Sequence, residues 1–510
     1  MQVARLRLTR FRIMSDIPDE ACGVFGVYSY GQISVFPYLY FGLISQNHRG
    51  HQSYGFLTFD GRFYEHKALG LVPIIKEKKL KKWLKKLPGH VGIGNVRYAT
   101  SGGTNEWFLR KDMQPVISES GEAKIGISYN GNIVNARQLV KEITKKIGDV
   151  SSSSDTELIC KKLLIEIMNG NDLTSSVRTC MEEMEGAFSV VGLTGNGELF
   201  AFKDPHGIKP LCCGHDKKNN TYAISSETVG LDINNFEYDF EINPGELVTI
   251  SENGLTREQI VKHVKKALCS FEFAYFARPD SNLGNGKYVY EVRRDFGRNL
   301  GKEYSEIIRN LDLVVPIPET AIDAAYGLHE ETGVMLEYAL RRHRYVTERD
   351  YILLPGERYA TIDKKINIVK DKISGKKIAV VEDSIVRGDT SRVIVKKLYE
   401  AGAKEVHVFV TYPRIIAPCF YGIDMATFRE LIGYKREPEE VAKKIGAKSV
   451  NYQSLDGFVK CTGLNKNELC LGCITCEYPT PLAQEMADEA RSKLEKGCVE
   501  KGRIYEGKNG

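Results

Sequence analysis

The sequence has no uninterrupted apolar run near the roughly 20 residues that a transmembrane helix requires, which argues against a helical membrane protein. Its net charge is only +5 and is spread along the chain, so it does not indicate a nucleic-acid partner. The basic opening stretch MQVARLRLTRFRI lacks the apolar core and small-residue cleavage site of a secretory signal. These absences predict a cytoplasmic protein that binds neither membranes nor nucleic acids.

With 510 residues, the sequence is long enough for two or three domains. From Cys22 to about Ile250, short alternating strands, glycine-rich turns and interspersed helices predict layered α+β packing. From about Leu311 onward, continuous apolar strands alternate with helices, which is typical of a parallel sheet covered on both faces. We therefore expect two domains of different class, joined near residues 251–268.

Twelve cysteines are many for a cytoplasmic chain, where disulfides are disfavoured. Cys470, Cys473 and Cys476 follow the pattern C-x-x-C-x-x-C, which is the spacing of metal ligands. This spacing predicts a bound inorganic group near the C-terminal end.

The stretch KKIAVVEDSIVRGDTSRVIVKKLYEAGAKEV (376–406) is the most informative part of the sequence. An apolar strand ends in the acids Glu382 and Asp383, and a loop rich in hydroxyl side chains leads into a helix. Backbone N–H groups at a helix N-terminus bind anions, and adjacent acids can hold ribose hydroxyls or a hydrated Mg²⁺. The alternative is a plain strand-to-helix turn.

This order of features resembles the phosphoribosyl-diphosphate (PRPP) motif of type I phosphoribosyltransferases. The resemblance implies that Glu382 and Asp383 face the ribose and Mg²⁺, and that the following loop holds the 5′-phosphate. The loop residues assigned to substrate binding in this way are Ser384, Arg387, Gly388, Thr390 and Ser391.

Cys22, in the context DEACGVFGV, has a bland interpretation as a buried cysteine that opens a strand. Its C-G-V-F-G context also resembles the processed N-terminus of the Ntn amidotransferases, which hydrolyse glutamine. The α-amine of an N-terminal cysteine has a reference pKa near 7.7–8.0, so it can act as general base to the thiol. Residues 1–21 must then be a leader that is removed, whether translation starts at Met1 or Met14.

Further segments match the Ntn amidotransferases in order: NHRGHQSYGF (47–56), GNVRYATSG (94–102), YNGNIVN (129–135) and SSSSDTELI (151–159). The match implies that Arg97 binds the glutamine α-carboxylate and that Asn130 and Gly131 donate to the oxyanion. It also implies that Asp155 pairs with the glutamine α-amine. Asp155 additionally lies in a possible helix capping box formed by Ser154 and Glu157.

The two domains together resemble the amidophosphoribosyltransferases, from Cys22 to about Cys476. That family makes 5-phosphoribosylamine from PRPP and glutamine, the first committed step of purine biosynthesis. In its iron–sulfur subclass four cysteines hold a [4Fe–4S] cluster, and by motif these are Cys269, Cys419, Cys473 and Cys476. A structural zinc site is the alternative. The family further implies Mg²⁺, a homotetramer and feedback inhibition by purine nucleotides.

The expected organisation is a leader (1–21), an αββα Ntn-hydrolase glutaminase domain (22–255), an α/β phosphoribosyltransferase domain (256–470) and a cluster-binding tail (471–510).

Three departures from the family pattern fall around the PRPP site. Ala321 stands where a hydroxyl is usual, and Asp389 stands in the phosphate loop where threonine is usual. The loop that closes over PRPP is altered at 348–355 and 361–369, where Lys364 and Lys365 remain but an arginine is missing. An alternative is therefore a paralogue with a degenerate PRPP site that acts as a regulatory or nucleotide-binding protein. A glucosamine-6-phosphate synthase is a third possibility, which the PRPP motif opposes.

Overall fold

The N-terminal half of this computed structural model is built on two antiparallel sheets, and the description covers residues 22–98, 106–147, 154–262, 265–343 and 366–498. The first sheet has seven strands in the order β11 (Glu237–Glu241), β9 (Cys212–Asp216), β10 (Thr221–Ser225), β1 (Gly23–Ser29), β4 (Val91–Arg97), β2 (Ser53–Phe59) and β3 (Phe63–Leu69). The second has six, in the order β13 (Gly254–Gln259), β12 (Glu246–Ser251), β8 (Leu199–Lys203), β7 (Gly186–Thr194), β6 (Ala123–Ile133) and β5 (Val116–Ser120).

The two sheets face each other through an apolar layer that includes Val24 and Ile93 from the first sheet and Val191 from the second. Helices cover both outer faces. On the first sheet they are α1 (Phe36–Ser45), α2 (Glu77–Lys86) and α7 (Thr228–Asp232). On the second they are α4 (Ala136–Ile147), α5 (Asp155–Met168) and α6 (Leu173–Glu183); α3 (Glu106–Lys111) precedes β5. This αββα layering confirms the predicted fold class of the first domain.

The second domain is built on a five-stranded sheet of parallel strands in the order β16 (Met335–Leu336), β15 (Leu313–Pro316), β19 (Lys377–Glu382), β20 (Glu405–Val410) and β21 (Ser449–Tyr452). One face packs against α8 (Val289–Glu303), α9 (Ser305–Ile308) and α10 (Ile322–Thr332). The other packs against α13 (Asp389–Glu400), α14 (Pro438–Ile445) and the short α12 (Lys370–Ile373). β17 (Leu340–Arg342) and β18 (Ile366–Ile368) form a separate antiparallel pair. The parallel α/β class predicted for this half is confirmed.

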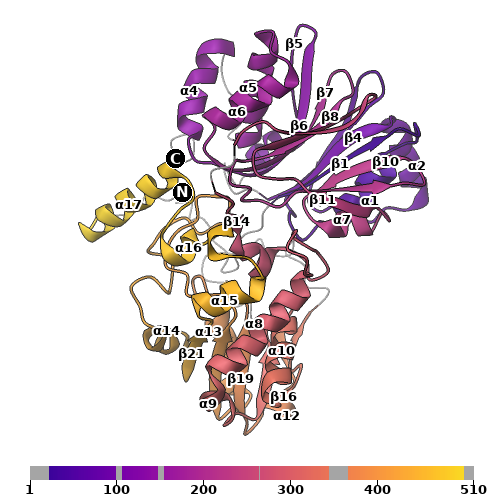
Figure 1. The fold of residues 1–510 in the computed structure, drawn as a ribbon. Coiled ribbons are helices and arrows are strands. Elements are labelled where there is room, and N and C mark those ends of the chain that lie inside the picture. The colour runs from indigo at the N-terminus through magenta and orange to yellow at the C-terminus, as the bar shows by residue number, and fades with distance from the viewer. Residues whose placement is uncertain (1–21, 99–105, 148–153, 263–264, 344–365, 499–510) are drawn as a thin grey trace, which may run out of the picture.

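A third apolar core lies where the two halves meet, and the C-terminal segment contributes to it (Figure 1). There β14 (Leu268–Cys269) pairs in parallel with β22 (Leu469–Cys470), and the π-helix η1 (Glu272–Phe276) follows β14. The remaining elements here are α15 (Leu455–Thr462), the 3₁₀ turn η3 (Lys466–Glu468), α16 (Gly472–Thr475) and α17 (Pro481–Glu495). Among the described residues, no helix is both long and apolar enough to span a bilayer.

Candidate active sites

Cys22 immediately precedes β1, which is hydrogen-bonded between β4 and β10. The thiol is buried and donates to the carbonyl of Tyr98 at 3.5 Å, and the Cys22 carbonyl accepts from Arg49 Nε at 3.2 Å. Burial raises the pKa of the Cys22 thiol, and the nearby charge of Arg97 opposes that rise. A thiol held in this way needs a local base to become a nucleophile.

Two of the side chains predicted to act on glutamine carry donors that have no hydrogen-bond partner within the described ranges. Arg97 is buried and pairs with Asp112 at 3.2 Å through Nη2, while its Nη1 is unpartnered. Asn130 is 1% exposed and its Nδ2 is unpartnered. Buried donors without partners are costly, so they indicate places where a ligand completes the site. A carboxylate suits the guanidinium, and a carbonyl or oxyanion suits the amide.

Gly131 lies next to Asn130 at a point where β6 approaches β7 too closely for a side chain. Its φ is +153°, and a Cβ there would lie 1.9 Å from the carbonyl oxygen of Ala187. The close approach explains why glycine is required, and it leaves the backbone as the only polar group that Gly131 can offer.

Asp155 begins α5 and is buried. Its carboxylate accepts from the N–H of Ile133 at 2.9 Å and from the hydroxyl of Tyr129 at 3.4 Å. The helix cap that the sequence indicates is present, because Ser154 is the N-cap and its side chain accepts from the N–H of Thr156. Asp155 thus fixes the end of the strand that carries Asn130 and Gly131.

In the second domain, Glu382 and Asp383 lie at the carboxyl end of β19, the middle strand of the parallel sheet. Glu382 accepts from Ser391 Oγ at 2.8 Å, and Asp383 accepts from Ser384 Oγ at 2.6 Å and from Thr320 Oγ1. Burial raises the pKa of Asp383, and these hydroxyl donors and Arg293 oppose the rise. The carboxyl edge of a parallel sheet is where open α/β folds bind ligands.

The loop from Ser384 to α13 has the conformation that its glycine requires. Gly388 is the N-cap of α13 with φ +84°, and a Cβ there would lie 2.5 Å from Ile432. Thr390 and Ser391 follow in the first turn of α13. The side chain of Arg387 contacts the segment that contains Asp424 and Glu430. Its Nε lies 2.9 Å from the Glu430 carboxylate, and its Nη2 lies 3.0 Å from the backbone carbonyl oxygen of Asp424. Those contacts hold the loop in place.

Two of the departures from the family pattern have a structural explanation. The carboxylate of Asp389 pairs with Arg392 one turn along α13, at 3.1 Å, so its charge is compensated. Ala321 is the N-cap of α10 and packs in the apolar core beneath the sheet, while the preceding Thr320 supplies a hydroxyl to Asp383. The altered segment at 348–355 and residues 361–365 of the second lie outside the described residues.

Four cysteines gather in the core between the domains. β14 places Cys269 directly opposite Cys470 on β22, and Cys419 and Cys473 belong to the same buried core. Cys476 lies at the edge of this core, because it ends α16 with φ +62° and is only half-buried. The structure therefore buries three of the four predicted ligands together with Cys470 in one core, and leaves Cys476 at its edge.

The glutamine amidotransferase domain family matches residues 107–232. The curated amidophosphoribosyltransferase of Methanocaldococcus jannaschii is 38% identical over 475 residues, covering 90% of this chain and 98% of the relative. That of Bacillus subtilis is 34% identical over 473 residues, covering 92% and 96%. The chain belongs to the amidophosphoribosyltransferase family. A solved structure of the B. subtilis PRPP amidotransferase, complexed with ADP and GMP, superposes with a TM-score of 0.81 at 34% identity, over 90% of this chain and 98% of that one.

Sequence reasoning missed several buried charged residues between the two sites, above all Arg49, Glu227 and Glu272. Their partners come from segments far apart in sequence, so no local pattern reveals the contacts. The one available signal was the N-H-R-G motif itself. Gly50 in that motif lies where a Cβ would be 2.6 Å from the backbone of Arg97, so the motif runs directly beside the expected glutamine site.

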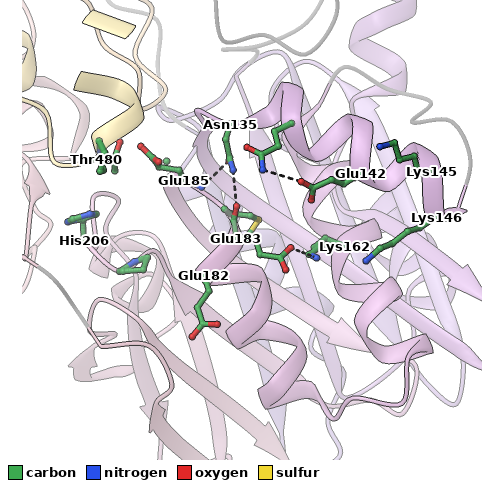
Figure 2. Close-up of a pocket in the computed structure, with 15 residues that line it drawn as sticks. Asn135, Glu142, Lys145, Lys146, Lys162, Glu182, Glu183, Glu185, His206 and Thr480 are labelled. Atoms are coloured by element: carbon green, nitrogen blue, oxygen red, sulfur yellow. Dashed lines mark hydrogen bonds and ion pairs between the residues drawn. The ribbon is translucent and has the colours of Figure 1, made fainter. Parts of the chain in front are cut away.

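A hollow of about 720 Å³ lies away from both candidate sites, between α4 to α6 and the C-terminal segment (Figure 2). Lys162 on its wall pairs with Glu166 at 3.2 Å and with Glu183. Across it, the N–H of Leu482 donates to Glu185 at 2.5 Å. None of the predicted catalytic or binding residues lines this hollow. We interpret it as part of the polar interface between the C-terminal segment and the first domain.

Proposed function

We propose that this chain makes 5-phosphoribosylamine from PRPP and glutamine, the first committed step of purine biosynthesis. The observation that carries the proposal is the combination of a buried Cys22 beside two unpartnered donors with an acid pair and anion loop at a parallel sheet edge. The first arrangement suits hydrolysis of glutamine, and the second suits a phosphorylated sugar. The acid pair and anion loop also favour a working transferase over the degenerate paralogue, because Asp389 pairs with Arg392 and Ala321 packs in the apolar core.

In the glutaminase step, the free α-amine of Cys22 removes the thiol proton and the thiolate attacks the glutamine amide carbon. Asn130 Nδ2 and the backbone N–H of Gly131 donate to the oxyanion that forms. Arg97 Nη1 binds the α-carboxylate, and Asp155 helps to hold the α-amine end. The proton returns to the departing nitrogen, ammonia leaves, and water then hydrolyses the thioester to glutamate.

In the transferase step, ammonia displaces pyrophosphate from C1 of PRPP. Glu382 and Asp383 bind the ribose hydroxyls, and the loop with Ser384, Gly388, Thr390 and Ser391 holds the 5′-phosphate at the start of α13. Arg387 keeps this loop in place through Glu430. The carboxylates of Glu382 and Asp383 are also suitable for Mg²⁺, which would neutralise charge on the pyrophosphate leaving group.

We propose that Cys269, Cys419, Cys470 and Cys473 hold a [4Fe–4S] cluster. All four are buried and none is in a disulfide. No three His, Cys, Asp or Glu side chains of the described ranges converge on one point, so the proposal rests on the burial of the four cysteines in one core, and a structural zinc site is the alternative. The cluster would supply structural cross-linking of the tail to both domains.

By likeness to the relative solved with ADP and GMP, purine nucleotides are the expected regulators of this enzyme. We also expect a homotetramer and a cytoplasmic location. The function itself is tested by PRPP consumption by purified, cluster-loaded protein with glutamine or with ammonia as nitrogen donor. Consumption with both donors supports the proposal, and binding of PRPP without consumption would favour the paralogue.

Removal of the leader is required by the proposed general base, because the nitrogen of Cys22 is a non-basic amide while residue 21 is attached. We expect intact-mass spectrometry of active protein to show a chain that starts at Cys22. Full-length protein that retains residues 1–21 should lack glutamine-dependent activity and keep ammonia-dependent activity. Glutamine-dependent turnover by a chain with its leader attached would contradict the mechanism.

Replacing Asp389 should have little effect on PRPP binding, since its carboxylate faces Arg392. We expect Asp389→Thr to change the dissociation constant of PRPP by less than about threefold, as for a partly exposed ion pair. Asp383→Asn should weaken binding at least about tenfold, because it removes a charged acceptor from the sugar site. Titration at fixed Mg²⁺ measures both. A 5- to 30-fold gain in affinity for Asp389→Thr would show that its carboxylate faces the phosphate.

A further inference from the structure

Arg49 joins the nucleophile of the first domain to the second domain. Its side chain is fully buried, and Nε donates to the carbonyl of Cys22 at 3.2 Å. Its two terminal nitrogens donate to Glu272, at 2.7 and 3.0 Å. Nη1 also pairs with Glu227. The backbone of Cys22 is thus held by a guanidinium whose own orientation is set by two carboxylates.

These two carboxylates tie Arg49 to the start of the second domain. Glu272 is 0% exposed and opens the π-helix η1, which follows β14. Glu227 belongs to the sandwich, but its other oxygen accepts from the N–H of Arg278 at 2.9 Å and from Ser281 Oγ at 2.7 Å. Burial alone would raise the pKa of Glu227, yet His48 and Arg49 hold it well below its usual range. The carboxylate is therefore charged and strongly held.

The π-helix is in turn fixed from the second domain by Arg293 on α8. This buried guanidinium donates to the carbonyls of Phe273 at 2.9 Å, Tyr275 at 3.1 Å and Ala277 at 2.8 Å. Three backbone acceptors on one arginine fix the position of η1 and hence of Glu272 relative to α8. The position of the Arg49 guanidinium therefore depends on the second domain as well as on the two-sheet sandwich of the first domain.

We propose that Arg49 is a positioning residue for glutamine hydrolysis, which orients Cys22 according to the placement of η1 in the second domain. This inference rests on the proposed glutaminase role of Cys22. The Arg49 guanidinium is held by two carboxylates and has little conformational freedom. Because it donates to the Cys22 carbonyl, it holds the Cys22 backbone in an orientation suited to attack. Displacement of a reacting group by about 1 Å can cost about 100-fold in rate.

The test compares Arg49→Lys, Glu272→Gln and the double variant in the processed holoenzyme, which starts at Cys22. We expect each single variant to lower glutamine-dependent kcat about 100-fold while ammonia-dependent kcat changes less than about threefold. The double variant should be no worse than either single one, since both break the same connection. The matched control is Arg257→Lys with Glu246→Gln, another Arg–Glu pair of the sandwich at 2.7 Å, which should leave both activities unchanged.

A second readout does not need turnover: the rate at which iodoacetamide alkylates Cys22, followed by mass spectrometry. The same variants should change this rate, and the control pair should not. Unchanged alkylation and unchanged glutamine-dependent kcat would overturn the inference. Equal loss of both activities with a lowered melting temperature would also overturn it, because a merely structural role predicts that result. A wild-type protein that fails to consume PRPP with ammonia would instead refute the proposed function, and the alkylation rates would still test Arg49.

Discussion

Cys22→Ala should abolish glutamine-dependent formation of 5-phosphoribosylamine and leave the ammonia-dependent reaction within about twofold of wild type. The thiol is the only group at the start of β1 that can form the acyl intermediate, and loss of a nucleophile costs a factor of at least about 10³ in kcat. The PRPP loop lies in the other domain, at the start of α13, so ammonia supplied from solution should still react.

The matched control is Cys160→Ala, which removes a thiol equally buried in the same domain but on α5, where it donates to backbone carbonyls. This variant should lose some stability from the cavity it leaves and keep the glutamine-dependent reaction. Measurement of glutamate release and of PRPP consumption separates the two half-reactions. Glutamate release by Cys22→Ala above the background of boiled protein would show that another residue is the nucleophile.

Cys470→Ser should remove the iron–sulfur cluster, whereas Cys476→Ser should leave it intact. Cys470 lies directly opposite Cys269 in the β14–β22 pair, whereas Cys476 is only half-buried at the edge of that core. Anaerobically purified wild type and Cys476→Ser should carry about four iron atoms per chain. Cys470→Ser should carry almost none and should unfold at a lower temperature, since cluster binding and folding are linked.

The two substitutions serve as each other's control, because they make the same chemical change six residues apart in one motif. Iron and sulfide analysis, together with the visible absorption of the cluster, provides the measurement. Loss of iron from Cys476→Ser with iron retained in Cys470→Ser would restore the ligand set predicted from the motif. Stoichiometric zinc in the wild type, without iron or sulfide, would refute the cluster itself.

The fold class followed from the sequence because its signals are local. The continuous apolar strand Lys377–Glu382 shows in its own residues that both of its faces are buried, and the short strands of the first domain, such as Gly23–Ser29, are also recognisable locally, although Gly23–Ser29 is buried on both faces. The position of Glu382 and Asp383 followed for the same reason, because the strand end and the helix start bracket them in sequence. The pairing of Asp389 with Arg392 was also within reach, since residues three apart on a helix are neighbours.

The rest of the site depends on contacts that no local pattern contains. In C-x-x-C-x-x-C the outer cysteines are equivalent by spacing, and only the pairing of Cys470 with Cys269 distinguishes it from Cys476. The connection between Arg49, Glu227 and Glu272 likewise joins three distant segments. Such contacts are determined by the tertiary fold. The N-H-R-G motif supplies the arginine but does not indicate which carboxylates it pairs with.

The pairing of β14 with β22 also sets an order of events during translation. The hydroxyl of Ser270 reaches the carbonyl of Cys470 at 2.8 Å, across 200 residues of chain. At 5–20 residues per second, a ribosome delivers β22 about 10–40 s after β14. The sandwich can form in that interval, but Cys269 and the edge of β14 must wait for the last segment. In ribosome-bound chains that stop before Leu469, β14 should therefore lack its partner strand and be accessible to chaperones. Synthesis of the complete chain supplies β22 and allows the pair to form.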